Sequence, residues 1–180
     1  SGMTAVKLAG ATGAEMWRTA ISGTNPITAG AYAQTVAVDA NDDVVVGGDT
    51  QNGTTNKDEG DFTVVKLAGS NGAEQWRFTI PGLVVTGASC NGCDNAIGVA
   101  VDPATQEIVA AGNRYIGSPV DFDGTLELTV VKLSTGGVQQ WRRDITGPGQ
   151  SGAGINVFTG LTLAASGDPV VAGGINGVGT

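Results

Sequence analysis

Histidine is absent from this chain of 180 residues, and cysteine occurs only twice. Without histidine there is no Ser-His-Asp triad, no histidine general base and no histidine metal ligand. The cysteines, Cys90 and Cys93, form a Cys-Asn-Gly-Cys segment, which lacks the second pair that a closed zinc site needs. Three interpretations remain: a small disulfide across a loop, two free thiols, or a redox or metal site. Of these we expect the disulfide.

Charge is also scarce. Charged residues make up 14% of the chain, against about 25% in typical domains, and the net charge is −8. An acidic chain of this kind does not favour phosphate backbones or anionic membranes, and no apolar run approaches the length of a membrane-spanning helix. We therefore expect no nucleic-acid partner and no membrane insertion. Together with the cysteine pair, the composition fits an extracytoplasmic setting: secreted, periplasmic or at the cell surface.

One phrase occurs three times in the chain. It reads TAVKLAGATGAEMWRTAI from Thr4, TVVKLAGSNGAEQWRFTI from Thr63 and TVVKLSTGGVQQWRRDI from Thr129. A recurrence every 60 residues or so is the signature of a repeat architecture. The residues that recur most clearly are three tryptophans and three lysines: Trp17, Trp76, Trp141, Lys7, Lys66 and Lys132.

Each complete repeat contains four strand-like runs, which we call A, B, C and D. Short turns that contain Asn-Gly or Gly-Gly join C to D, and such turns are typical of antiparallel hairpins. Each repeat is therefore predicted to be a four-stranded antiparallel meander. The runs are Thr35–Asp39, Val44–Gly48, Phe62–Leu67 and Ala73–Ile80 in the first complete repeat, and Ile97–Asp102, Glu107–Gly112, Leu126–Leu133 and Val138–Ile145 in the second.

The connections between these runs are unequal in length. The A–B and C–D turns are short, whereas the D-to-A and B-to-C connections are long. In a meander, the D–A and B–C connections leave from the same end of the strands. The long loops are therefore expected on one face, and loops held on a rigid scaffold are the usual place for binding.

The recurring tryptophans and lysines have two interpretations. Three exposed tryptophans could form a ligand platform, but recurrence in every repeat favours packing between neighbouring repeats. A catalytic lysine that occurs three times is improbable. For the lysines and the recurring arginines we expect pairing with repeat acids, stacking on tryptophan, or solvation of an outer strand.

Two B-to-C loops carry acidic clusters. One contains Asp121 and Asp123 before Gly124, and the other contains Asp58 and Asp61. The EF-hand spacing is incomplete in both, so we interpret these residues as solvated turn acids, with calcium binding as a hypothesis. A carboxylate-pair hydrolase is the third interpretation.

The sequence resembles bacterial β-propeller repeats of secreted and cell-surface proteins. The resemblance is carried by Val65-Lys66-Leu67 with Gly72 and Trp76, by the Val-Ala-Val-Asp segments that end at Asp39 and Asp102, and by Val170-Val171-Ala172-Gly173-Gly174. More distantly, Ala11-Thr12-Gly13 with Trp17 is similar to the tryptophan-docking repeats of pyrroloquinoline quinone enzymes. No quinone or catalytic-base residues can be assigned, so we interpret the second resemblance as shared blade architecture.

The resemblance implies an all-β propeller of four-stranded antiparallel blades. The chain, taken as a single segment over 1–180, holds about three blades' worth: half blades at about 1–21 and 157–180, and full blades at about 34–80 and 96–145. Propellers typically close with about 4–8 blades. We therefore expect the partner to be either the remaining blades of a longer chain or another copy of this one.

The function expected from these observations is that of a non-catalytic scaffold without a resident cofactor, calcium excepted. It would serve binding, adhesion or assembly through the face with the long loops, with a protein or glycan as ligand. Two alternatives stay open. The chain could be a fragment of a propeller-based enzyme whose active site lies in other blades or domains, or a purely structural repeat of a cell-surface assembly.

Overall fold

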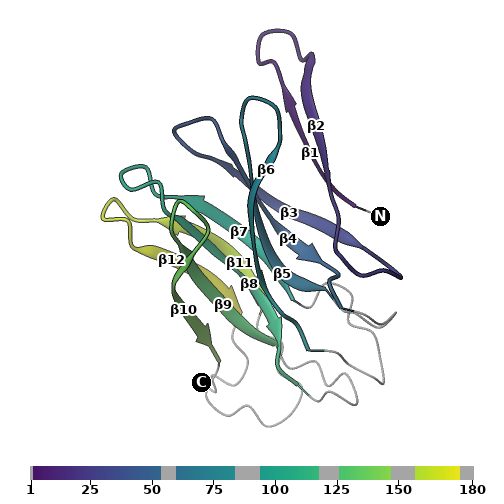
Figure 1. Cartoon of the computed structure of the whole chain (residues 1–180). Helices are drawn as coiled ribbons and strands as arrows, with labels where there is room; N and C mark the ends of the chain where they lie inside the picture. The colour runs from purple at the N-terminus through teal and green to yellow at the C-terminus, as the bar shows by residue number, and fades with distance from the viewer. Residues whose placement is uncertain (1, 54–59, 84–93, 118–125, 147–156, 175–180) are drawn as a thin grey trace.

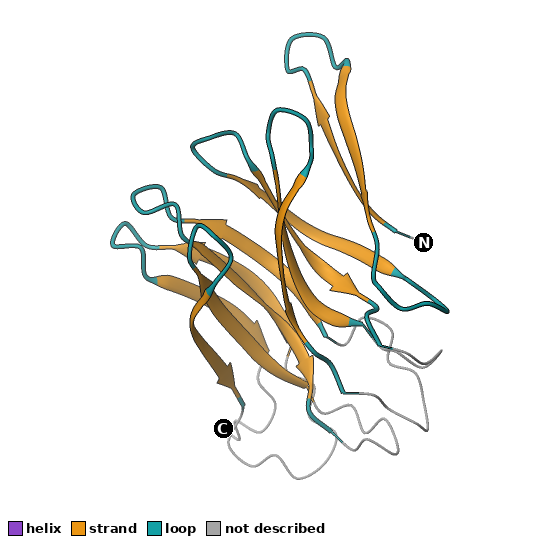
Figure 2. Ribbon diagram, viewed as in Figure 1, coloured by secondary structure: helices purple, strands orange, loops and turns teal. Residues whose placement is uncertain are grey.

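The computed structural model describes residues 2–53, 60–83, 94–117, 126–146 and 157–174. Every regular element within these ranges is a β-strand, and every strand pair is antiparallel (Figure 2). The prediction of an all-β chain with four-stranded antiparallel sheets is confirmed. The strands in chain order are β1 (Met3–Leu8), β2 (Glu15–Ile21), β3 (Ala31–Val38), β4 (Val44–Thr50), β5 (Asp61–Leu67), β6 (Glu74–Ile80), β7 (Asn95–Val101), β8 (Ile108–Tyr115), β9 (Leu126–Leu133), β10 (Gln139–Ile145), β11 (Val157–Leu163) and β12 (Pro169–Gly174).

The strands form four sheets that follow one another along the chain. Strands β3 to β6 form one meander and β7 to β10 a second, while β1–β2 and β11–β12 are two-stranded. The sheets lie side by side in chain order, with β1–β2 at one end of the stack and β11–β12 at the other (Figure 1). We call the strand positions of each sheet A to D, so that β1–β2 holds C and D, and β11–β12 holds A and B.

Two of the three A strands, β3 and β7, begin earlier than the sequence pattern predicts. Strand β3 starts at Ala31 rather than Thr35, and the register of its ladder with β4 shifts between Ala33 and Thr35. Such a bulge places an extra residue in one strand and interrupts the alternation of inward and outward side chains. Opposite the bulge, a Cβ on Gly48 would overlap the carbonyl oxygen of Tyr32. This position of the Gly-Gly pair therefore requires glycine.

Three apolar clusters hold the stack together, one between each pair of neighbouring sheets. Between β1–β2 and the β3–β6 sheet, Met3 and Ile21 pack with Val65 and Leu67. The central cluster joins the two four-stranded sheets through residues such as Phe62 and Leu133, all of them almost completely buried. The third joins the β7–β10 sheet to β11–β12 around Phe158. Since each four-stranded sheet has a neighbour on both faces, almost every residue of β4, β5, β8 and β9 is buried, whichever face it lies on.

The sheets approach one another most closely at their A strands. Strand β3 lies against β7, and β7 lies against β11. The approach is close enough that a Cβ on Gly47 would stand 3.0 Å from Cγ1 of Val99, and a Cβ on Gly98 would stand 2.6 Å from Cζ of Phe158. Farther out, at the D strands, the space between sheets is occupied by the recurring tryptophans. Sheets that lie close together at the A strands and farther apart at the D strands require small residues at the A strands and large residues at the D strands.

Candidate functional site

The two ends of the strands differ in the chain that joins them. The short A–B and C–D turns gather at one end of the strands (Figure 1). The strand ends that the longer connections β2–β3, β4–β5, β6–β7, β8–β9 and β10–β11 join lie at the other end. We call these the short-turn end and the long-connection end. The lysine pairs lie at the short-turn end. Several buried carboxylates, which no repeat pattern had indicated, lie at the long-connection end.

Two of the recurring tryptophans dock on the C–D turn of the next sheet. Nε1 of Trp17 donates to the backbone oxygen of Gly69 at 2.9 Å, and Nε1 of Trp76 donates to that of Thr135 at 3.0 Å. The rings lie flat enough on the turns that a Cβ on Gly72 would stand 2.6 Å from Cε3 of Trp17. Trp141 instead packs against the cluster around Phe158. The structure thus places all three tryptophans in contacts between sheets.

The recurring lysines pair with acids at the short-turn end. Nζ of Lys66 lies 2.7 Å from Oδ2 of Asp39 and 3.4 Å from Oδ2 of Asp43, and this pair is almost fully buried. Lys132 pairs with Glu107 at 2.7 Å in a more open setting. Lys7 differs, because its own sheet has no A–B turn. It donates to the backbone oxygen of Gly69 at 2.9 Å and lies 3.6 Å from Asp42, both in the neighbouring sheet.

The acids that end the A strands also shape the A–B turns. Oδ1 of Asp39 accepts hydrogen bonds from the backbone N–H groups of Asn41 and Asp43, and Oδ1 of Asp102 accepts from that of Ala104. These are Asx-turn bonds. Backbone donors dominate the lowering of the Asp102 pKa, with a smaller contribution from Lys132. Both acids are therefore structural.

A buried carboxylate closes strand β4 at the long-connection end. Asp49 is almost fully buried, and its Oδ1 has no hydrogen-bond partner within the part of the chain that the structure describes. Burial raises its pKa to about 7, so the group is partly protonated at neutral pH. Oδ2 faces the turn at Gly60, where a Cβ would stand 3.0 Å away.

A second buried carboxylate lies where β7 begins. Asp94 is fully buried, and its Oδ1 accepts a hydrogen bond from the backbone N–H of Tyr115 at 3.0 Å. Burial raises the pKa of Asp94 to about 7, against the opposing effects of the Tyr115 N–H and of Arg114. Asp61 adds to the rise from the neighbouring sheet, where it accepts hydrogen bonds from Asn52 and from the backbone N–H of Gly82.

A charged network crosses the β7–β10 sheet beside this acid. Arg114 Nη1 lies 2.7 Å from Oε1 of Glu127, the residue opposite it on β9, and Arg142 Nη2 lies 3.4 Å from the same oxygen. Burial raises the pKa of Glu127, and Asp144 adds to this, while both arginines oppose it. The network is largely covered, since the side chains of Arg114 and Glu127 are only 15% and 9% exposed. Its acids accept from fixed partners, which is the arrangement of structural ion pairs.

The carboxylates at the long-connection end were not among the sequence predictions, apart from Asp61. One sequence signal could have indicated Asp49, because it follows the Gly-Gly pair of β4. Its register equivalent in β8 is Asn113. Oδ1 of Asn113 accepts a hydrogen bond from the backbone N–H of Phe158 in the next sheet. Nothing in the sequence marks Asp94 or Arg114, because their burial depends on how neighbouring sheets meet.

The predicted calcium and disulfide residues lie mostly beyond the described ranges. Asp58, Asp121, Asp123, Cys90 and Cys93 lie outside the described residues, so calcium binding and the disulfide stay predictions. Asp61 is described, and it serves as a hydrogen-bond acceptor within the β3–β6 sheet. Among the residues that the structure describes, no group of three or more acidic or cysteine side chains could hold a metal ion.

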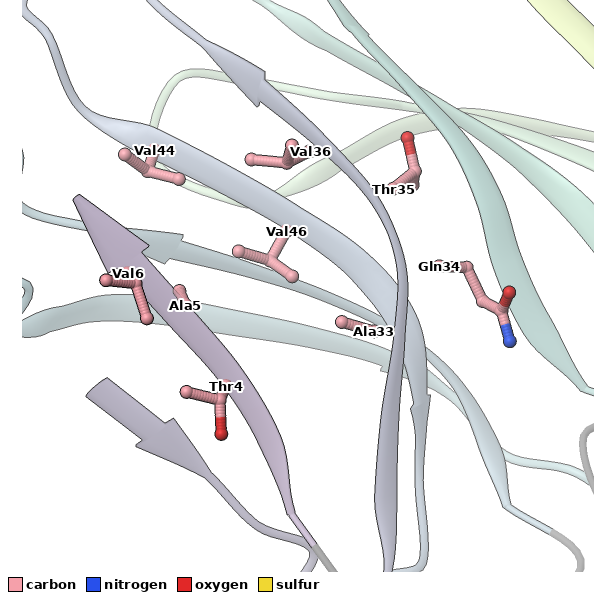
Figure 3. Close-up of a pocket in the computed structure, with 9 residues that line it drawn as sticks. All are labelled: Thr4, Ala5, Val6, Ala33, Gln34, Thr35, Val36, Val44 and Val46. Carbon is pink, nitrogen blue, oxygen red and sulfur yellow. The ribbon is translucent and has the colours of Figure 1, made fainter. Parts of the chain in front are cut away.

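A cavity of about 370 Å³ opens between β1 and the start of the next sheet. Ala5 and Val6 border it from β1, and Val36, Val44 and Val46 border it from β3 and β4 (Figure 3). It is lined by small and apolar side chains and carries no charged group among its lining residues. The lining offers no reactive group. It resembles the surfaces that pack against a neighbouring sheet elsewhere in the chain, but here no sheet among the described strands covers it.

No protein-family description matches the sequence, and no curated protein matches it. Within the described residues there is also no helix long and apolar enough to cross a membrane.

Proposed function

We propose that this chain is a segment of a β-propeller that acts as a non-catalytic, extracytoplasmic scaffold and binds a protein or glycan through its long-connection end. The observation that carries the proposal is the wedge-shaped packing of successive four-stranded sheets. Their A strands lie against one another, while tryptophans fill the wider gap at the D strands. Sheets stacked in this way turn about an axis near their A strands, which is the arrangement of propeller blades.

The division of loops supports binding at the long-connection end. Four of the six short turns are used for contacts within or between sheets, two through the lysine pairs and two through the tryptophans. The long-connection end has exposed apolar side chains, among them Ile27 and Leu83. Oδ1 of Asn25 accepts the backbone N–H of Ile27, and Oδ1 of Asp61 accepts that of Gly82, directly before Leu83. Loops held by a rigid base are suited to recognition.

The proposal is tested with a printed array of defined oligosaccharides and, in parallel, with peptides selected from a displayed random library. Hits are then measured by calorimetry against two variants. Ile27→Ser with Leu83→Ser removes exposed apolar groups at the long-connection end, and Val138→Ser removes one at the short-turn end. We expect only the first variant to lose affinity, by about tenfold or more. Absence of hits, or hits that only Val138→Ser weakens, would contradict the proposal.

A further inference from the structure

The two ends of the stack have complementary gaps. Strands β1 and β12 each have a single ladder partner among the described strands, so each presents one unpaired edge. The β1–β2 hairpin occupies the C and D positions of a sheet, and β11–β12 occupies the A and B positions. An unpaired edge is a template on which a further strand can add.

We propose that β12 of one copy pairs antiparallel with β1 of a second copy, so that the two hairpins form one four-stranded sheet equivalent to β3–β6. The inference rests on the propeller architecture of the proposed function and is independent of its ligand. The ladder between β4 and β5 sets the expected register: Val45 faces Lys66 and Gly47 faces Val64. The equivalent pairs between copies are Val170 with Lys7, and Ala172 with Ala5.

The turns match this template. The A–B turn of β11–β12 has the same length as that of β3–β4, with Gly167 at φ 82° where Asp42 has φ 66°. The C–D turn of β1–β2 has the same length as that of β5–β6, with Gly13 at φ 70° and Gly72 at φ 72°. Both halves of the shared sheet are thus already in the conformation that the complete sheet uses.

Charge complementarity favours a second copy as the occupant. In the template, Asp43 stands directly before β4, pairs with Lys66 and accepts the backbone N–H of Gly69 at 2.9 Å. The residue at the same place before β12 is Asp168. Lys7 has no such acid in its own sheet. In the assembly, Asp168 of one copy pairs with Lys7 of the other and accepts the backbone N–H of Gly10.

The tryptophan contacts are complementary in the same way. Trp17 and Trp76 dock on the C–D turn of the next sheet, but β11–β12 has no such turn, and Trp141 makes no equivalent hydrogen bond within the described residues. Conversely, the C–D turn of β1–β2 carries no tryptophan: a Cβ on Gly10 or Gly13 would meet nothing within 4 Å. In the assembly, Trp141 packs on Gly13 and its indole N–H reaches the backbone oxygen of Gly10.

Apolar side chains on both sides of the proposed contact are uncovered in a single copy. Val36 and Val38 are 64% and 55% exposed, whereas their equivalents Val99 and Val101 pack against the preceding sheet. Val170 is 54% exposed, whereas its equivalents on β4 and β8 are fully buried. In the shared sheet Val170 faces Val36 and Val38 of the second copy, beside the cavity in Figure 3.

The contact is head-to-tail, so it forms a ring if its rotation closes. Within the described residues, each copy contributes two complete four-stranded sheets and two halves. Two copies that exchange contacts at both ends make six sheets, within the range of about 4–8 blades at which propellers close. The expected assembly is therefore a closed dimer.

The mass of the chain in solution tests the inference. Light scattering coupled to size exclusion is expected to give twice the 17.9 kDa of one chain. Gly10→Ala is the decisive variant. Its Cβ is free of contacts within one copy, but a Cβ at the template position Gly69 overlaps the backbone oxygen of Asp42. We expect it to weaken dimerisation by about tenfold or more. Gly136→Ala, in the C–D turn of the last complete sheet, meets only Ser134 Oγ at 3.9 Å and should leave the dimer intact.

Charge exchange gives a second, independent readout. Lys7→Glu and Asp168→Lys are each expected to weaken the dimer, and the double variant to restore it. Circular dichroism of each variant reports whether the strands still form. A monomeric wild-type chain, or a dimer unaffected by Gly10→Ala and by both charge changes, would overturn the inference. A monomer that still binds its ligand through Ile27 and Leu83 would overturn only the assembly, and a dimer without ligand binding would overturn only the proposed function.

Discussion

The indole N–H of Trp17 donates a 2.9 Å hydrogen bond to the backbone oxygen of Gly69, in a turn of the neighbouring sheet 52 residues away in sequence. Trp76 and Thr135 repeat the relationship one sheet further on. Each bond satisfies the one polar group of a large apolar ring, and each joins the D strand of one sheet to the C–D turn of the next. This contact, the buried charges and the close backbone approaches all have measurable consequences.

The tryptophan contact is tested by two glycines with matched conformations. Gly72→Ala is expected to destabilise the fold by about 2–4 kcal/mol, because the left-handed strain costs about 1–2 kcal/mol and the new Cβ overlaps the Trp17 ring. Gly13→Ala carries the same strain at nearly the same φ, but its Cβ meets nothing within 4 Å. Chemical denaturation of both variants in the Gly10→Ala background measures the difference. Equal losses would mean that the ring does not require glycine in the turn.

The buried lysine is expected to matter more than its counterpart. Lys66→Met leaves Asp39 and Asp43 without the cation between them, in a site that is almost closed to solvent. Removing one partner of a buried pair typically costs about 3–5 kcal/mol. Lys132→Met breaks the more exposed pair with Glu107 and should cost about 1 kcal/mol or less. Urea titrations of the two variants at neutral pH give the comparison, and a smaller loss for Lys66→Met than for Lys132→Met would contradict it.

The free energy of unfolding should fall as the pH rises from about 5 to 8. Asp49 and Asp94 have pKa values of about 7 in the folded chain, raised from an ordinary value near 3.8. Between these values the folded state holds protons that the unfolded state has released, so each step up in pH favours unfolding. Well above pH 7 both states are ionised and this contribution is constant.

Neutral amides at these two positions should remove most of that slope. Asp49→Asn and Asp94→Asn keep the shape of each side chain, and the amide oxygen introduced by Asp94→Asn can still accept the backbone N–H of Tyr115. Each substitution is expected to stabilise the chain at pH 8 by on the order of 1–3 kcal/mol, with little effect at pH 5. Thermal unfolding followed at several pH values provides the test, and a slope that survives both substitutions would be the contrary result.

The opposite dependence is expected below pH 4. The pKa values of Asp43, Asp102 and Glu107 are lowered in the folded state. Such groups stabilise the fold above their ordinary pKa, and the stabilisation is lost as the pH falls through the folded value. Acid titrations should therefore show a loss of stability as the pH falls below about 4, and Asp49→Asn and Asp94→Asn should leave this loss unchanged.

The bulge opposite Gly48 provides the last test. A Cβ at this position overlaps the carbonyl oxygen of Tyr32, which belongs to the backbone and cannot rotate away. Gly48→Ala is expected to cost about 3 kcal/mol or more. Gly160 lies beside the corresponding bulge of β11 but has open space around it, so Gly160→Ala should change stability by less than about 1 kcal/mol. Similar losses in both variants would rule out the backbone approach as the cause.

Much of the fold follows from local pattern. The repeated phrase, the Gly-containing turns and the alternating runs indicate twelve antiparallel strands, and most strand ends agree with the structure within one or two residues. Strand β3 was the main exception, since it begins at Ala31 rather than Thr35, because the bulge at Ala33 breaks the alternation on which such a prediction depends. The partners of Trp17 and Trp76 could be anticipated only as packing between repeats, since the turn that receives each ring lies in a different sheet.

The sequence by itself determined the strands, the turns and the order of the repeats, because these depend on residues close together in the chain. Only the tertiary structure decided which copies of a residue are equivalent in environment. Lys66 lies between two acids of its own sheet, while Lys7 contacts the next sheet. Val99 packs against the preceding sheet, while the side chain of Val36 is exposed. The lysines differ because only the complete sheet contains the A–B turn that carries the acids, and the valines differ because only Val99 has a preceding sheet packed on its A strand, so both outcomes depend on residues far away in the chain.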